Sequence, residues 1–241
     1  KRILMTKKIP VLMFHNISEI KGEKSSVFHK DFYNQIKYLT NLGYKCVNLR
    51  NIEDNELNKK IIITFDDGYE NIYKLAMPIL NEFNQKATCF IVKNQIDGFN
   101  LWDSNRNDYK KYKLMNLNQI QEWSEKGFEI GAHTLDHVNL TKLTTENKNK
   151  QINDPISFFN DKLNISVKSF AYPFGSYDDE CIDLLKKNYN YAVTTKPSLY
   201  NKKKFTNYEI PRISINSSTS LLKFFLKILT NYEDYKLKFK L

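Results

Sequence analysis

The alternation of two sequence patterns constrains the fold of this chain more than any other feature. Short runs of β-branched or aromatic residues alternate with longer stretches of helical periodicity, which is typical of a parallel sheet with helices packed outside it. Apolar residues recur at helical spacing from Phe32 to Leu42 and from Ile72 to Phe83. We therefore predict an α/β fold with strands at Val11–Phe14, Lys45–Leu49, Lys60–Phe65, Ala87–Val92, Phe128–Ala132, Ser169–Tyr172, Tyr191–Thr194 and Ile210–Ile215.

The chain length favours one main domain. A chain of 241 residues falls in the size range of single-domain α/β barrels or of one to two ordinary domains. No apolar run approaches the roughly 18 to 20 residues needed to cross a bilayer. We expect a main domain over residues 1–217 and a tail over residues 218–241, in which leucines and phenylalanines alternate with lysines. The tail either packs on the domain as a helix, as we expect, or lies as a basic amphipathic segment on an anionic membrane.

Three local signals refine this outline. Pro78 lies inside the second helical stretch and predicts a kink or break near Met77. The run Ser176–Asp179 resembles a capping box that opens a helix at about Tyr177. The segment Gln95–Lys113 is polar and aromatic with little periodicity, so we predict a long loop over one face of the barrel.

Net charge and cysteine spacing exclude few classes of partner or site. Lys and Arg exceed Asp and Glu by 37 − 27 = 10 residues, which favours anionic partners such as nucleic acid, anionic lipid or an acidic polymer. Much of the excess lies in scattered lysines and the chain lacks a recognised nucleic-acid-binding motif, so we expect no nucleic-acid partner. Cys46, Cys89 and Cys181 are far apart, which favours buried free thiols over a disulfide framework or a metal knuckle.

Two motifs combine the residue types of a hydrolytic metal site. Asp66 and Asp67 follow one predicted strand, and His133 and His137 follow another. Parallel barrel strands open on one face, so both motifs should project into the same mouth. Histidines four residues apart, on a helix or across a tight helical turn, project to the same side. Because catalytic zinc usually takes three His or carboxylate ligands, the two histidines and one of the aspartates predict a metallohydrolase.

These motifs resemble those of a known family. The runs Thr64–Gly68 (TFDDG) and His133–His137 (HTLDH) resemble the first two motifs of the polysaccharide deacetylases, carbohydrate esterase family 4. The resemblance extends in order from about residue 11 to about residue 215. It implies a distorted (β/α) barrel of about seven strands, TIM-like, with Asp67 and the two histidines of the second motif as metal ligands and Asp66 as the general base.

The chemistry of such a family explains this division of roles. A carboxylate bound to a cation is a poor proton acceptor, whereas its free neighbour can take a proton from the attacking water. The run Phe170–Gly175 (FAYPFG) resembles the family's third motif and implies that the backbone N–H of Phe174 stabilises the oxyanion. By itself, such a run is also typical of a turn that closes a strand. A general acid must finally protonate the leaving amine.

The chain departs from the common family pattern in two places. Ala171 stands where the third motif usually has an Arg, and no histidine follows His137 to act as the acid. His15, at the end of the first predicted strand, becomes the candidate acid. The opening of the chain is similar to that of the biofilm poly-N-acetylglucosamine deacetylases, in which an early histidine acts as the acid and the third motif lacks its Arg.

Four further residues are candidates for the substrate-binding cleft. Arg212 ends the last predicted strand and lies either near Asp66, replacing the missing Arg, or in a surface or structural ion pair. Trp102 and Asp103, in the long loop, either bind a sugar ring or pack the loop. Tyr172 belongs to the third motif and completes the expected set.

The sequence thus predicts a metal-dependent N-deacetylase. We expect it to act on N-acetylhexosamine units, N-acetylglucosamine first, of a bacterial surface or biofilm polysaccharide, with Zn²⁺ as cofactor and Co²⁺, Ni²⁺ or Mn²⁺ as alternatives. A deacetylase of peptidoglycan or lipopolysaccharide glycan, or an inactive carbohydrate-binding relative, is the alternative. We expect a monomer in the cell envelope or outside the cell, with an anionic membrane as a further partner of the tail.

Overall fold

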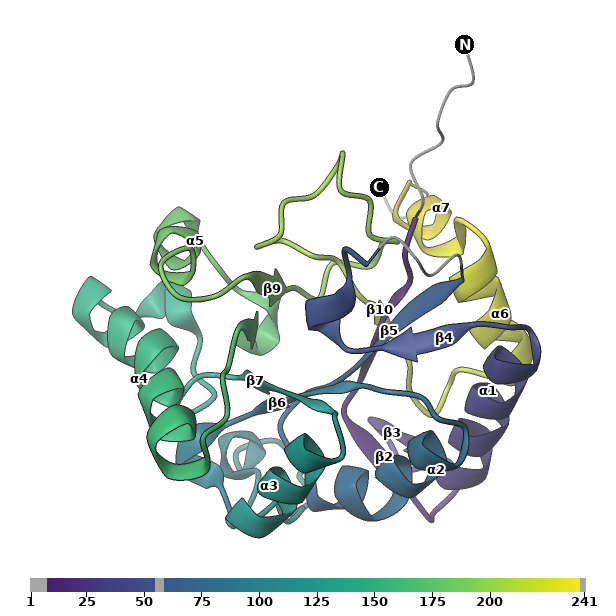
Figure 1. The fold of residues 1–241 in the computed structure, drawn as a ribbon, viewed down its shortest axis with the longest axis horizontal. Coiled ribbons are helices and arrows are strands. Elements are labelled where there is room, and N and C mark those ends of the chain that lie inside the picture. The colour runs from purple at the N-terminus through teal and green to yellow at the C-terminus, as the bar shows by residue number, and fades with distance from the viewer. Residues whose placement is uncertain (1–7, 55–58, 239–241) are drawn as a thin grey trace.

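A computed structural model describes residues 8–54 and 59–238, and its centre is a parallel sheet (Figure 1). The strand order is β10-β1-β5-β6-β7-β8-β9, with β4 paired beside β5. The strands of this sheet are β1 (Val11–Phe14), β4 (Lys45–Val47), β5 (Lys60–Phe65), β6 (Thr88–Ile91), β7 (Glu129–Ala132), β8 (Ser169–Ala171), β9 (Tyr191–Val193) and β10 (Ile213–Ser214). Ile210 bridges to β9 and Ile213 pairs with β1, so one short segment joins the two ends of the sheet. The fold is the predicted distorted (β/α) barrel.

Most strands lie where the sequence predicts them, because a strand that is buried on both faces gives a continuous apolar run that can be recognised in the sequence. All six residues of β5 are buried, which explains its continuous apolar run. The last strand is much shorter than the predicted Ile210–Ile215, because Pro211 has no N–H to donate to a ladder. A separate parallel pair, β2 (Asn16–Ser18) and β3 (Ser26–Phe28), has only three residues per strand, too few for a recognisable pattern.

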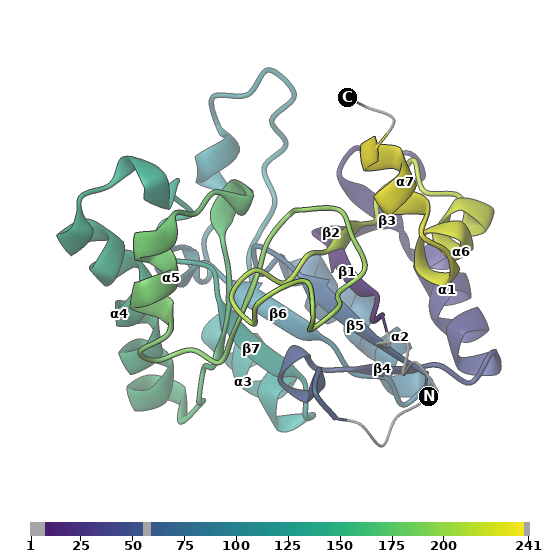
Figure 2. The same cartoon turned by 90° about the horizontal axis from the view of Figure 1, so that it is seen from above.

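Helices cover the outside of the sheet (Figures 1 and 2). The α-helices are α1 (His29–Asn41), α2 (Met77–Glu82), α3 (Leu117–Glu125), α4 (Thr145–Leu163), α5 (Asp179–Leu185), α6 (Leu221–Leu229) and α7 (Tyr232–Lys238). A π-helical turn occupies Ile72–Ala76, and 3-10 turns occupy Leu49–Asn51, Lys93–Gln95, Leu101–Asp103, Leu140–Lys142 and Pro173–Gly175. The long segment between β6 and α3 is the predicted loop and extends away from the sheet in Figure 2.

Two predicted helix boundaries need correction. The π-helical turn continues directly into α2, and Pro78 lies in the first turn of α2, where the helix type changes. The break near Met77 is therefore a change of helix type. Helix α5 begins at Asp179 rather than Tyr177, because the side chain of Asp178 accepts a hydrogen bond from the N–H of Cys181 and caps the helix.

The C-terminal helix α6 packs on the domain through one face only. Phe224 and Ile228 are buried, and the ring of Phe225 meets that of Tyr38 in α1. On the other face Leu222 is 73% exposed. Contact of this face with an anionic membrane stays a prediction, as does a domain boundary at residue 217. Within residues 8–54 and 59–238, no helix is long and apolar enough to cross a membrane.

A buried carboxylate joins three strands at the N-terminal end of the barrel. The Glu129 side chain accepts hydrogen bonds from the hydroxyls of Thr88 at 2.8 Å and Ser169 at 2.6 Å, and from the backbone N–H of Arg50 at 2.9 Å. Thr88, Glu129 and Ser169 begin β6, β7 and β8, so this one side chain fixes the spacing of three neighbouring strands.

Removing this carboxylate should destabilise the barrel. Glu129→Ala leaves two buried hydroxyls and the part-buried N–H of Arg50 without their acceptor, and we expect the free energy of unfolding to fall by about 3 kcal/mol or more. Urea denaturation measures it. Glu125→Ala in α3, whose side chain is exposed, is the matched control and should change stability by no more than about 0.5 kcal/mol. Equal stability of the two variants would contradict a structural role for Glu129.

Candidate metal centre and active site

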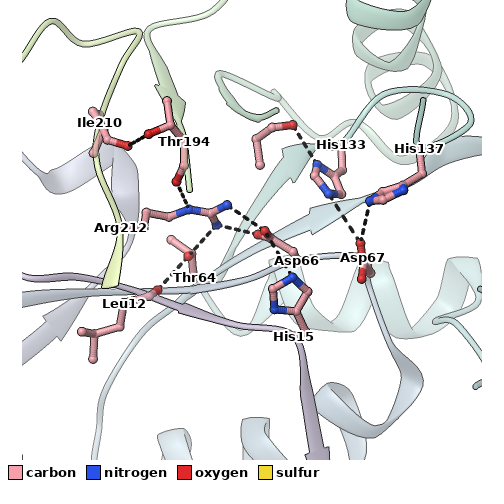
Figure 3. Close-up of polar contacts among 11 residues, drawn as sticks. Leu12, His15, Thr64, Asp66, Asp67, His133, His137, Thr194, Ile210 and Arg212 are labelled. Atoms are coloured by element: carbon pink, nitrogen blue, oxygen red, sulfur yellow. Dashed lines mark hydrogen bonds and ion pairs between the residues drawn. The ribbon is translucent and has the colours of Figure 1, made fainter. Parts of the chain in front are cut away.

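Residues that follow four different strands meet at one end of the barrel, and Figure 3 shows those that follow three of them, β1, β5 and β7. Asp66 and Asp67 follow β5, His133 follows β7, His15 follows β1, and Phe174 lies shortly after β8. Together with the second histidine of the HTLDH motif they line one cleft of about 340 Å³. The carboxyl ends of parallel strands open on this face, which is where barrel enzymes carry their sites.

The backbone around the site is strained at the residues that present side chains to it. Asp67 has a φ of 73°, Thr134 of 66° and His137 of 56°, in the left-handed region that residues other than glycine seldom adopt. The two histidines therefore lie on a tight turn and not on a helix. The N–H of His137 donates to the Thr134 hydroxyl at 2.9 Å, which closes the turn.

Asp67, His133 and His137 form a set that fits a divalent cation. One ligand atom from each lies within 4.8 Å of the others, and all three residues are buried. Nε2 of each imidazole is 3.4 Å from Oδ1 of Asp67, yet this oxygen has no hydrogen-bond partner among the described residues. A buried carboxylate oxygen between two imidazoles, without a hydrogen bond, is what a cation site with two His and one Asp requires.

Hydrogen bonding, burial and nearby charge act differently on the two imidazoles. Nδ1 of His133 lies 2.7 Å from the carbonyl of Ala171, so Nδ1 carries the hydrogen and Nε2 faces Asp67 with its lone pair. Burial lowers the pKa of His137 to about 4, against the opposing effect of Asp67. Burial would also lower the pKa of His133, but the carboxylates of Asp67 and Asp66 outweigh it and raise that pKa.

Arg212 pairs with Asp66 through both carboxylate oxygens. Nη1 donates to Oδ1 at 2.6 Å and Nη2 to Oδ2 at 2.7 Å, while Nε donates to the carbonyl of Thr194 and Nη1 also to the hydroxyl of Thr64. Burial would raise the pKa of Asp66, but the guanidinium outweighs it and holds that pKa below its usual value. Of the two placements predicted for Arg212, the one beside Asp66 is found.

Arg212 is a correction to the predicted substrate-binding set, because it is completely buried behind Asp66 and is not among the residues that line the cleft. Tyr172 borders the cleft, but its side chain is completely buried and its hydroxyl donates to the carbonyl of Tyr208 at 3.0 Å. Contact of Tyr172 with a substrate stays a prediction.

His15 and Phe174 lie at the mouth of the cleft. Nε2 of His15 is 4.0 Å from Oδ2 of Asp66, and the His15 side chain is 38% exposed. Phe174 has a φ of 60° and is 58% exposed. Gly175 follows with a φ of 69°, and a Cβ there would lie 2.0 Å from the hydroxyl oxygen of Thr195. The turn after β8 thus requires glycine at this position, next to Phe174 at the cleft.

The long loop supplies a wall of the cleft. Trp102 and Asp103 line it, as the sequence predicts, and contact with a sugar stays a prediction. Arg106, Asp108 and Lys110 of the same loop also line it, and Lys110 forms an ion pair with Glu23 in the turn between β2 and β3. Nothing in the sequence links these charges, because the two segments are far apart along the chain.

Tyr69 is a site residue that sequence reasoning missed. Its side chain lies against Tyr112 and lines the cleft, and burial, followed by the charge of Asp67, raises its pKa far above the usual value. The hydroxyl therefore stays protonated beside the Asp67 carboxylate. Its position two residues after Asp67 is the only sequence signal, and an aromatic residue there is equally typical of a core position.

Comparison with known proteins identifies relatives over most of the chain. A family model for polysaccharide deacetylases matches residues 53–193, more than half of the chain. The putative polysaccharide deacetylase YxkH of Bacillus subtilis is 29% identical over 220 residues, which cover 88% of this chain and 73% of that protein. The poly-β-1,6-N-acetyl-D-glucosamine N-deacetylase of Staphylococcus epidermidis is 28% identical over 226 residues, which cover 88% and 76%. The crystal structure of the putative polysaccharide deacetylase BA0330 from Bacillus anthracis superposes with a TM-score of 0.80 at 28% identity, over 92% of this chain and 69% of that one.

Loss of either imidazole should empty the metal centre. We expect the wild-type protein to retain zinc through dialysis and His133→Ala and His137→Ala to lose it, because each substitution removes one of three expected ligands. Zinc per chain is measured by plasma mass spectrometry. His29→Ala, which changes a histidine in α1, is the control and should keep its zinc. Undiminished zinc in both site variants would rule out this ligand set.

Proposed function

This chain belongs to the polysaccharide deacetylase family, and on that premise we propose that it removes N-acetyl groups from N-acetylglucosamine units of a bacterial surface or biofilm polysaccharide, releasing acetate. The division of two adjacent buried carboxylates carries the proposal. Asp67 faces two imidazoles, whereas Asp66 faces Arg212 and His15. Support for the polymer comes from the Staphylococcus epidermidis relative, whose name specifies poly-β-1,6-N-acetyl-D-glucosamine.

The ligand set favours Zn²⁺, and Co²⁺, Ni²⁺ or Mn²⁺ also accept imidazole and carboxylate ligands. Asp67, His133 and His137 would hold such an ion, which would polarise the acetamide carbonyl and lower the pKa of the attacking water. The burial of all three ligands excludes bulk water and strengthens these electrostatic effects.

In the proposed mechanism Asp66 is the general base. Arg212 keeps its carboxylate ionised and fixes its orientation, while each oxygen retains a lone pair that can accept a further hydrogen bond. A base with a low pKa is adequate here, because the attacking water is itself made more acidic. Asp66 takes a proton from this water as the oxygen bonds to the acetamide carbon.

The remaining steps use Phe174 and His15, which both line the cleft at its mouth. The backbone N–H of Phe174 stabilises the oxyanion, held in place by the left-handed conformation of that residue. As the C–N bond breaks, His15 gives a proton to the amine, and acetate leaves. We propose Trp102 and Asp103 as contacts for the sugar, since both line the cleft beside these groups.

Acetate release tests the proposed function. We expect the zinc-loaded protein to release acetate from β-1,6-linked N-acetylglucosamine oligomers, measured with an enzyme-coupled acetate assay. Asp66→Asn should lower kcat by about 10²–10⁴ because it removes the base, while the zinc content stays at the wild-type level. Peptidoglycan and lipopolysaccharide glycan are the comparison substrates. Acetate release only from peptidoglycan would show that peptidoglycan, and not the proposed polymer, is the substrate. Acetate release from none of these substrates would favour a carbohydrate-binding protein without activity.

The leaving group tests the role of His15. An amine must be protonated as it leaves, but the phenolate of p-nitrophenyl acetate departs without a proton. His15→Ala should therefore lower kcat on the N-acetylglucosamine oligomer by about 10²–10⁴ and barely affect hydrolysis of the ester. Asp66→Asn, the matched variant, should slow both reactions. Equal losses on the two substrates in His15→Ala would show that His15 is not the acid.

A further inference from the structure

The two histidines of the metal centre are supported in different ways. The ring of His133 is held by a hydrogen bond from Nδ1 to the carbonyl of Ala171. Nδ1 of His137 is buried and has no hydrogen-bond partner among the described residues. A metal-ligating histidine almost always uses its second nitrogen in a hydrogen bond that fixes its ring orientation. Another interaction must therefore orient the His137 ring.

Aromatic rings surround His137 in place of that hydrogen bond. The indole of Trp102 stacks on the imidazole, with ring centroids 4.5 Å apart and planes inclined by 27°. Phe174 packs edge-on at 4.8 Å and 72°. Stacking restricts rotation of the His137 ring about its Cβ–Cγ bond. An imidazole that ligates a cation also carries part of its charge, which the face of an indole attracts.

The long loop is anchored so that it can hold Trp102 in this position. Two residues before Trp102, the buried Asn100 side chain donates to the carbonyl of Lys110 at 3.0 Å and accepts from the N–H of Tyr112 at 2.7 Å, closing the neck of the loop. At its base, the N–H of Met115 donates to the carbonyl of Gly68, next to Asp67, at 2.9 Å. The loop is thus attached to the same motif that supplies the first metal ligand.

We propose that Trp102 is a positioning residue of the metal centre: it stacks on His137 and holds Nε2 toward Asp67, replacing the missing hydrogen bond. One face of the indole then stacks on the imidazole of His137, and the other face is available to a substrate in the cleft. The long loop becomes a structural part of the metal site. The inference rests on the ligand set of the proposed function, but not on the identity of the substrate.

Metal affinity without any glycan tests this inference. Metal-free protein is titrated with Zn²⁺ in competition with a chromophoric chelator. Trp102→Ala should weaken zinc binding by about 10–100-fold, the usual effect of losing the support of a metal ligand. Trp102→Phe, which keeps a stacking ring, should bind more tightly than Trp102→Leu, which fills similar space without one. Tyr109→Ala removes an aromatic residue of the same loop and cleft, and it should leave zinc affinity unchanged.

Fluorescence provides a second readout. The chain has two tryptophans, Trp102 and the buried Trp123 in α3. Co²⁺ quenches indole fluorescence at short range, so binding should quench the wild-type emission strongly and that of Trp102→Phe weakly. A thermal melt of each metal-free variant separates loss of metal support from loss of folding.

The outcomes distinguish the inference from the proposed function. Wild-type zinc affinity in Trp102→Ala, or equal affinities in Trp102→Phe and Trp102→Leu, would overturn the role of Trp102 while leaving the ligand set intact. Should Trp102→Ala fail to fold, the zinc affinities of Trp102→Phe and Trp102→Leu still test whether a stacking ring is needed at this position. Unchanged zinc affinity in His137→Ala would instead show that the proposed ligand set is wrong. None of these measurements depends on acetate release.

Discussion

Two carboxylates side by side in the barrel interior are the constraint on which the site depends. Asp66 and Asp67 are adjacent and buried, and an unpaired buried charge costs several kcal/mol. The fold provides a different source of positive charge for each. A guanidinium faces Asp66, and two imidazoles that fit a cation face Asp67. Because Arg212 already occupies one side of Asp66, Asp67 is the carboxylate that fits a cation, and the proposed separation into ligand and base follows from this arrangement.

The contact that controls Asp66 also helps to close the barrel. Arg212 lies in the short segment that joins β9 to β1, and its guanidinium reaches the carbonyl of Thr194 after β9 and the hydroxyl of Thr64 in β5. Pro211 limits the strand pairing there, so side-chain hydrogen bonds replace part of the missing ladder. Closure of the sheet and the charge state of the base therefore depend on the same residue.

The site draws on segments well outside the residues that match the family model. His15 and Arg212 lie on either side of residues 53–193, whereas Asp66, Asp67, His133 and His137 lie within them. The candidate ligand set thus comes from the part of the chain that matches the family model, while the two residues beside Asp66 come from segments outside it. The long loop lies inside the matched region, yet it acts through stacking rather than through a ligand.

The sequence by itself determined the alternating pattern of the barrel and, for the candidate metal centre, the two histidines and the aspartate pair, while the choice of Asp67 as the ligand came from the family resemblance. Periodicity locates long buried strands such as β5, and the parallel arrangement brings Asp67, His133 and His137 to one face, because parallel strands all end there. Local patterns were weaker at short elements: β2 and β3 have too few residues to show a period, and the cap of α5 depends on which of several polar side chains reaches a free N–H. Only the tertiary structure decided the contacts between distant segments. It placed Arg212 behind Asp66 rather than in the cleft, buried Tyr172 and stacked Trp102 on His137, since side-chain direction depends on packing that no local pattern records.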